Sequence, residues 1–211
     1  MITQQQILQW LQTYATFIEQ NKDYLTELDA AIGDADHGIN MNRGFQKVAN
    51  QLCSLTEKDI SQIFKTVSMT LISSVGGASG ALYGTFFLQA SNAVTGLSEL
   101  TPIDTAKLLE TGLLGIKERG KANFGDKTML DTLEPAINTF TNAISQGNNT
   151  LEALQKAVIA AEQGMKNTIP LIAKKGRATY LGERSIGHQD PGATSAYFLL
   201  KTFLEVIEKS Q

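Results

Sequence analysis

Several features that mark other protein classes are scarce in this chain of 211 residues. It has one cysteine, Cys53, which excludes an internal disulfide and a cysteine-based zinc site and fits a reducing compartment. Its formal charge of −3 lacks the basic excess typical of nucleic-acid-binding proteins. The apolar runs are too short to span a membrane, and the first residues show no secretory signal. We therefore expect a cytoplasmic protein with neither nucleic acid nor membrane as a partner.

Strand signals are also nearly absent. No run of alternating β-branched residues lies between turn residues, whereas apolar residues recur at helical spacing along most of the chain. Two helix starts are marked by a capping residue followed by proline, at Thr101-Pro102 and at Asp190-Pro191. The pattern predicts eight or nine amphipathic helices, antiparallel around one core, and hence an all-α single domain over residues 1–211.

Glycine and small polar residues concentrate in four breaks between these helices, at residues 33–44, 73–85, 120–128 and 174–195. Gly120 is expected to end the helix before the third break. The last break is about twenty residues long, and loops of this length commonly serve as lids or binding loops. Because alternate connections of an antiparallel bundle lie at the same end, the four breaks are predicted to converge on one rim.

The first break brings three carboxylates together, those of Asp29, Asp34 and Asp36. Like charges this close repel and raise one another's pKa, so a gathered cluster needs a cation. Gly33 is expected to let the backbone turn sharply between them. An all-oxygen site with room for water suits Mg²⁺, which shares its coordination sphere with substrate phosphates. The alternative is that Asp34 and Asp36 are only turn and N-cap residues.

The second and fourth breaks carry groups that suit an anion. Residues 73–85 contain four glycines before and within a helix start, where backbone N–H groups bind phosphate, and Ser79 adds a hydroxyl donor. The alternative is a close helix–helix contact. The fourth break brings lysines and arginines into an acidic chain, and a guanidinium there would stabilise charge during phosphoryl transfer unless the loop is only a solvated surface. His188 is equally consistent with a general base and with a residue that fixes the loop.

Three motifs, in the same order and spread over nearly the whole chain, resemble those of the L subunits of dihydroxyacetone kinases. They are Asp29…Gly33-Asp34-Ala35-Asp36-His37-Gly38, Val75-Gly76-Gly77-Ala78-Ser79-Gly80, and Gly182-Glu183-Arg184-Ser185…Gly187-His188-Gln189-Asp190-Pro191-Gly192-Ala193. Each motif alone is weakly specific, but the combination is highly specific.

The resemblance implies an eight-helix antiparallel barrel with a nucleotide site at one end. It implies that Asp29, Asp34 and Asp36 hold two Mg²⁺ ions and that Arg177 acts in catalysis. The residues that it implies for nucleotide binding are His37, Gly38, Ile39, Asn40, Ala78, Ser79, Gly120, Met129, Arg177, Asp190, Pro191 and Gly192.

The same resemblance predicts the reaction. ATP-dependent members fuse this domain to a sugar-binding domain, whereas this chain ends at Gln211 and resembles the free-standing subunit of the phosphoenolpyruvate-dependent system. There, tightly bound ADP cycles with ATP, a phosphohistidine M subunit is the donor, and a K subunit holds dihydroxyacetone through its own histidine. The alternatives are an ATP-dependent kinase subunit for another small ketose, or a nucleotide-loaded regulatory subunit that binds a transcription factor.

Overall fold

The computed structural model describes residues 1–210, in which helices account for almost all regular structure. The α-helices are α1 (Gln4–Gln20), α2 (Lys22–Ile32), α3 (His37–Leu52), α4 (Ile60–Ser74), α5 (Gly77–Ala93), α6 (Pro102–Gly120), α7 (Leu130–Ser145), α8 (Thr150–Asn167) and α9 (Pro191–Lys209). Two 3₁₀ helices, η1 (Cys53–Leu55) and η2 (Arg177–Ser185), and two short strands, β1 (Ile2–Thr3) and β2 (Glu99–Leu100), complete the set.

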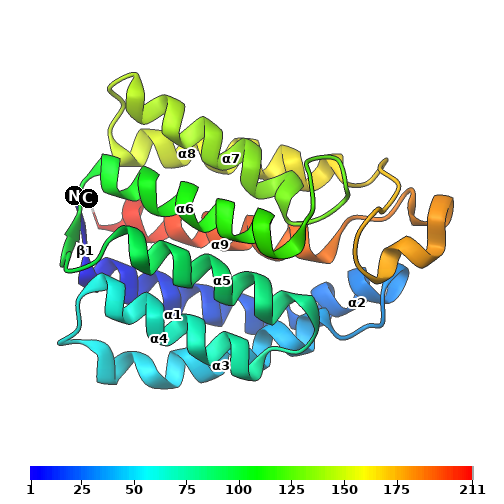
Figure 1. Ribbon diagram of the computed structural model, residues 1–211, viewed down its shortest axis with the longest axis horizontal. Helices are drawn as coiled ribbons and strands as arrows, with labels where there is room; N and C mark the ends of the chain where they lie inside the picture. The colour runs from blue at the N-terminus through cyan, green and yellow to red at the C-terminus, as the bar shows by residue number, and fades with distance from the viewer. Residues whose placement is uncertain (211) are drawn as a thin grey trace.

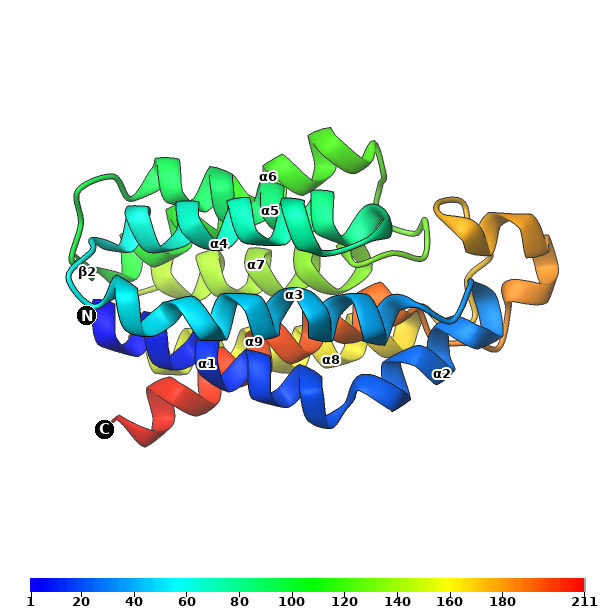
Figure 2. The same ribbon diagram turned by 90° about the horizontal axis from the view of Figure 1, so that it is seen from below.

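Eight of these helices form a closed antiparallel ring. From α3 to α9 each helix packs against the next, and α1 closes the ring by contacting both α3 and α9. The shorter α2 extends beyond the ring at one end, where η2 lies beside it (Figures 1 and 2). The predicted eight-helix antiparallel barrel is confirmed. No helix within residues 1–210 combines the length and apolar character needed to cross a bilayer.

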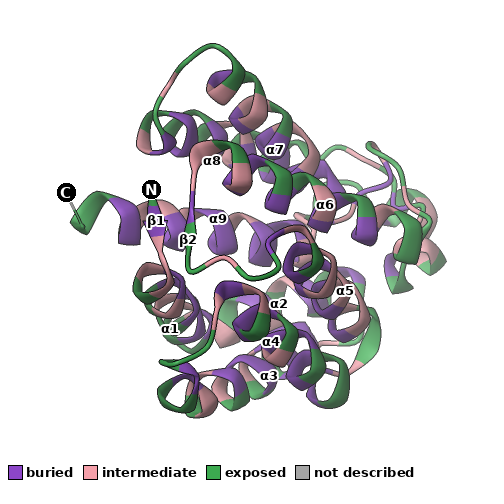
Figure 3. Ribbon diagram, turned by 60° about the vertical axis from the view of Figure 1, so that its left-hand side comes forward, coloured by how far each residue is buried: buried purple, intermediate pink, exposed green. Residues whose placement is uncertain are grey.

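The buried faces of the helices point into the ring, as Figure 3 shows. Trp10 of α1 lies at the centre of this core, with its ring 4.3 Å from that of Phe203 in a stacked arrangement and 6.3 Å from those of Phe64 and Phe87. Its indole N–H donates to the carbonyl of Leu199 at 2.9 Å, so that the one polar atom of the side chain is satisfied. Packing of this kind fixes the helices that carry the loops at the open end.

Local signals in the sequence position most helix ends. Thr101 and Asp104 form a capping box with Pro102 in the first turn of α6, and Asp190 caps α9 through the Ala193 N–H at 2.6 Å. At the end of α6 the expectation is only partly met, because Gly120 stays helical and Lys121 takes the left-handed conformation at φ 48°. Gly120 instead allows close packing, since an added Cβ would lie 3.2 Å from the Leu82 side chain.

Candidate active site

A cavity of about 470 Å³ opens at the end of the barrel where α2 and η2 lie. All four glycine-rich breaks contribute to its lining, so their predicted convergence is confirmed. The residues expected at the site that line it are Asp29, Asp34, Asp36, His37, Asn40, Ala78, Ser79, Gly120, Met129, Arg177, Asp190, Pro191 and Gly192. Gly38 and Ile39 do not. Gly38 packs against the Lys22 carbonyl of α2, and Ile39 is half exposed on the outside of α3.

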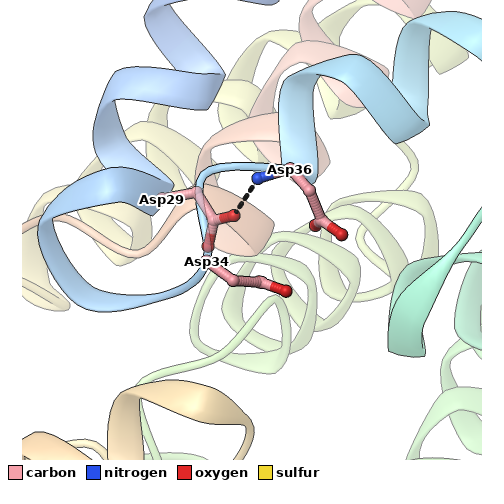
Figure 4. A group of neighbouring side chains, drawn as sticks. All are labelled: Asp29, Asp34 and Asp36. Atoms are coloured by element: carbon pink, nitrogen blue, oxygen red, sulfur yellow. Dashed lines mark hydrogen bonds between the residues drawn. The ribbon is translucent and has the colours of Figure 1, made fainter.

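The three aspartates gather at the turn between α2 and α3. Each offers one carboxylate oxygen, and these oxygens lie within 4.8 Å of one another. Figure 4 shows the side chains of Asp34 and Asp36 extending to the same side of the turn, with the Asp29 carboxylate set back against the turn beside the Asp36 N–H. This set of hard oxygen donors, open to the cavity on one side, fits a divalent cation such as Mg²⁺ that keeps water or phosphate ligands.

Asp29 also organises the backbone of this turn. Its Oδ2 accepts the N–H group of Asp36 at 2.8 Å (Figure 4) and that of His37 at 3.1 Å, and it therefore caps the N-terminus of α3 from the end of α2. Asp36 occupies the N-cap position without a side-chain cap, which leaves its carboxylate free for the cavity. The alternative interpretation, in which Asp36 is an N-cap residue, therefore does not describe its side chain.

The backbone of this turn bends at both Gly33 and Ala35. Ala35 adopts φ 59°, a left-handed conformation that costs a non-glycine residue free energy, whereas Gly33 has φ −138°. Gly33 is needed for a different reason, because a Cβ there would collide with the Asp29 carboxylate. The expectation that the backbone turns at Gly33 is confirmed, and the contact with Asp29 gives a second reason for glycine at this position.

Arg177 reaches across the mouth of the cavity from the start of η2. Its Nε lies 2.8 Å from Oδ2 of Asp34, and the Arg177 side chain is 68% exposed. An ion pair this exposed contributes little to stability. Its importance is positional, because it places a guanidinium beside the carboxylate cluster in a segment that the barrel helices do not enclose.

Opposite the aspartates, α5 presents its N-terminus to the cavity. Gly76 is its N-cap residue and makes no side-chain cap, so the first N–H groups of the helix have no side-chain partner. Asn40 packs against Gly76, and its Oδ1 accepts from Arg43 Nη2 at 2.6 Å. Since this bond fixes the amide orientation, the N–H₂ of Asn40 is left as a donor. The sequence did not reveal that Arg43 orients Asn40, because there Arg43 looks like an ordinary surface residue of a helix.

His37 is buried beside this helix terminus. Its Nδ1 lies 3.1 Å from Ser79 Oγ and its Nε2 lies 2.9 Å from Ser195 Oγ. Burial lowers the pKa of His37 to about 4, although the nearby carboxylates of Asp29 and Asp36 act in the opposite direction. The imidazole is therefore neutral near pH 7, and it is fully engaged by protein hydroxyls.

A sequence model of the DAK2 domain matches residues 31–205, most of the chain. The chain belongs to the DAK2 family. It is 46% identical over 200 residues to the "PEP-dependent dihydroxyacetone kinase, ADP-binding subunit DhaL" of Escherichia coli, with 95% of both chains covered. It is 44% identical over 208 residues to the "PTS-dependent dihydroxyacetone kinase, ADP-binding subunit DhaL" of Lactococcus lactis, covering 98% of this chain and 100% of that one. The resemblance seen in the sequence motifs is confirmed.

A solved structure has the same fold as this DAK2 domain. The "dihydroxyacetone kinase from C. freundii in complex with AMP-PNP and Mg2+" superposes with a TM-score of 0.73 at 26% sequence identity. The match covers 94% of this chain and 33% of that longer chain.

The connection between α6 and α7 of the DAK2 domain is held by a buried lysine that the sequence did not reveal. Lys127 has φ 63°, and its ammonium donates to the carbonyls of Thr168 at 2.7 Å and His188 at 2.5 Å. Burial lowers the pKa of Lys127, while Asp190 and Asp131 oppose the shift. Lys127 thus joins its own connection to the segments that carry Thr168 and His188. No local sequence motif predicts a contact between residues so far apart in the chain.

Two acidic residues complete this part of the site. Asp131 accepts the N–H groups of Gly125 at 2.6 Å and Thr128 at 2.7 Å, which fixes the turn before Met129. Asp190 lines the cavity, and burial raises its pKa to about 7, with Asp131 and Asp29 acting in the same direction. His188 contributes its backbone carbonyl to Lys127, a contact that tests neither interpretation of its imidazole.

Proposed function

We propose that this DAK2 domain is the ADP-binding subunit of a phosphoenolpyruvate-dependent dihydroxyacetone kinase, a phosphotransferase. The observation that carries the proposal is one cavity in which three clustered carboxylates face the open N-terminus of α5, with Arg177 at the mouth. Full-length relatives at 44–46% identity are named as such subunits. Phosphoryl transfer requires mainly positioning and charge neutralisation, which these groups provide.

Each group has a distinct task in this proposal. Asp29, Asp34 and Asp36 would hold Mg²⁺, which neutralises and orients nucleotide phosphates when it is bound. The N–H groups at the start of α5 and the Ser79 hydroxyl bind phosphate oxygens. Arg177 stabilises the negative charge that develops on the transferring phosphoryl group, because a guanidinium donates two parallel hydrogen bonds to such oxygens.

Finer features of the reaction belong to the same proposal. We infer two Mg²⁺ ions, a tightly bound ADP that cycles with ATP, a phosphohistidine donor on an M subunit, and dihydroxyacetone held on a K subunit. Both nitrogens of His37 are occupied by serine hydroxyls, which supports placing any covalent histidine chemistry on another chain. His188 faces solvent on the loop before α9.

The test is a reconstituted transfer assay. The purified protein is loaded with MgADP and desalted, and phosphoenolpyruvate-pathway proteins are added with and without a K-type subunit. We expect bound ADP to become ATP in both mixtures and dihydroxyacetone phosphate to form only when the K-type subunit is present. Failure to retain ADP, or transfer to dihydroxyacetone without any partner, would contradict the proposal.

A further inference from the structure

A continuous chain of hydrogen-bonding groups runs from the barrel interior to the cavity. Tyr83 Oη of α5 lies 2.8 Å from Ser195 Oγ of α9, and Ser195 Oγ lies 2.9 Å from His37 Nε2 of α3. His37 Nδ1 in turn lies 3.1 Å from Ser79 Oγ. His37, Tyr83 and Ser79 all border the cavity, but Tyr83, Ser195 and His37 are buried, whereas Ser79 is partly exposed. The last group of the chain is therefore the one most open to a ligand.

The protons of this chain have two self-consistent orders. A neutral imidazole donates from one nitrogen and accepts at the other, and each hydroxyl donates a single proton. In the outward order Tyr83 donates to Ser195, Ser195 donates to His37 Nε2, and His37 Nδ1–H donates to Ser79. The proton of Ser79 is then free to point into the cavity.

The inward order reverses the last two bonds. Ser79 donates to His37 Nδ1, and Nε2–H donates to Ser195, whose own proton goes to the Gly192 carbonyl at 3.1 Å. Ser79 then presents only lone pairs to the cavity. An anion beside Ser79 selects against this order, because lone pairs of the hydroxyl would face those of the anion. Donors linked in sequence also polarise one another, which strengthens the terminal donor.

We propose that Tyr83, Ser195 and His37 are positioning residues that hold the Ser79 hydroxyl as a donor toward a nucleotide phosphate, with His37 in the Nδ1–H tautomer when the nucleotide is bound. The inference rests on the proposed nucleotide-binding function. It goes beyond that function by assigning a task to buried groups on three helices, and it requires only a rearrangement of protons within the chain.

The tautomer of His37 is measurable directly. Ring ¹⁵N resonances distinguish protonated from unprotonated nitrogens, and the chain has only two histidines, so a His188→Gln variant assigns the signals. With saturating MgADP we expect a protonated Nδ1 and an unprotonated Nε2 in His37. The Nε2–H tautomer, or a ring protonated on both nitrogens, would overturn the inference.

Tyr83→Phe tests the role of the first donor because it keeps the ring and removes only the hydroxyl. We expect about threefold to tenfold weaker MgADP binding by calorimetry, the worth of one hydrogen bond, and a shift of His37 toward Nε2–H. The control is Ser68→Ala, which removes a buried hydroxyl bonded to the Gly84 carbonyl at 2.6 Å, outside the chain. Ser68→Ala should lower the melting temperature and leave affinity and tautomer unchanged.

The outcomes separate this inference from the proposed function. If the wild-type protein binds no MgADP, both are wrong. If it binds MgADP with His37 in the Nε2–H tautomer, or if Tyr83→Phe changes neither affinity nor tautomer, only the inference is wrong.

Discussion

Asp34 differs from Asp29 in that its side chain has no structural contact within residues 1–210 beyond its ion pair with Arg177. Replacing it should therefore leave the fold intact. We expect Asp34→Asn to abolish retention of ADP through desalting, because one metal ligand is lost from a site with three. Nucleotide content of the purified variant measures the effect. Asp23→Asn, at a 95% exposed side chain on α2, is the matched control. Stoichiometric ADP in Asp34→Asn would contradict the assignment.

Replacing Arg177 tests whether this residue contributes to ADP binding or to phosphoryl transfer. We expect Arg177→Ala to lower the rate of phosphoryl transfer about 100-fold or more while ADP affinity falls far less, since a transition-state contact affects the rate selectively. Single-turnover kinetics and calorimetry measure the two quantities. Arg184→Ala, on the same 3₁₀ helix η2, serves as the control. Equal losses in rate and affinity would refute a transition-state role.

Asp190 makes the stability of the protein depend on pH. Its carboxyl has a pKa of about 7 in the fold, well above the ordinary pKa of 3.8 for this group, so the folded state binds more protons between these values. Stability contributed by this group is therefore present below pH 4 and lost as the pH rises toward 7. We expect Asp190→Asn, which retains an acceptor for the Ala193 N–H, to reduce that loss. Urea unfolding of both proteins in EDTA from pH 4 to 8 measures the free energy of unfolding. Parallel curves of this free energy against pH for the two proteins would contradict the expectation.

At the scale of elements, the connection between α6 and α7 depends on Lys127. Its ammonium satisfies carbonyls from two other segments, and without it these acceptors are left buried. We expect Lys127→Met to lower the free energy of unfolding by about 1–3 kcal/mol, the cost of unpaired buried polar groups. Lys121→Met, an exposed lysine of the same connection, is the control in urea unfolding. Equal stability of the two variants would contradict this role.

The elements themselves were largely predictable, because their signals are local. Apolar spacing revealed the helices, and capping residues such as Thr101 and Asp190 marked where they begin. Contacts between distant segments were not predictable in this way. The 3₁₀ helix η2 was expected only as a loop, and Lys127 and Ser195 act through partners far away in sequence. The left-handed Ala35 was missed because its conformation is imposed by the Asp29 hydrogen bonds on either side of the turn.

At the scale of the molecule, ligand binding should be coupled to global stability. The cavity is lined by residues from α2, α3, α5, α6, η2 and α9, so a ligand that binds there stabilises the whole barrel against unfolding. With MgADP at 100 times its dissociation constant, we expect stabilisation by about 2.7 kcal/mol, or roughly 5–10 °C in melting temperature. EDTA should reverse most of it. A melting temperature unaffected by EDTA would show that the carboxylates do not contribute through metal.

The short pairing of β1 with β2, Ile2 opposite Leu100, holds the start of the chain at the end of the barrel remote from the cavity, and α9 runs toward that same end (Figures 1 and 2). A tether attached at either terminus would therefore leave the opening unobstructed. Immobilisation of the protein on a sensor chip through a terminal tag would display every molecule with its binding face outward, ready for kinetic measurements with nucleotides and candidate subunits.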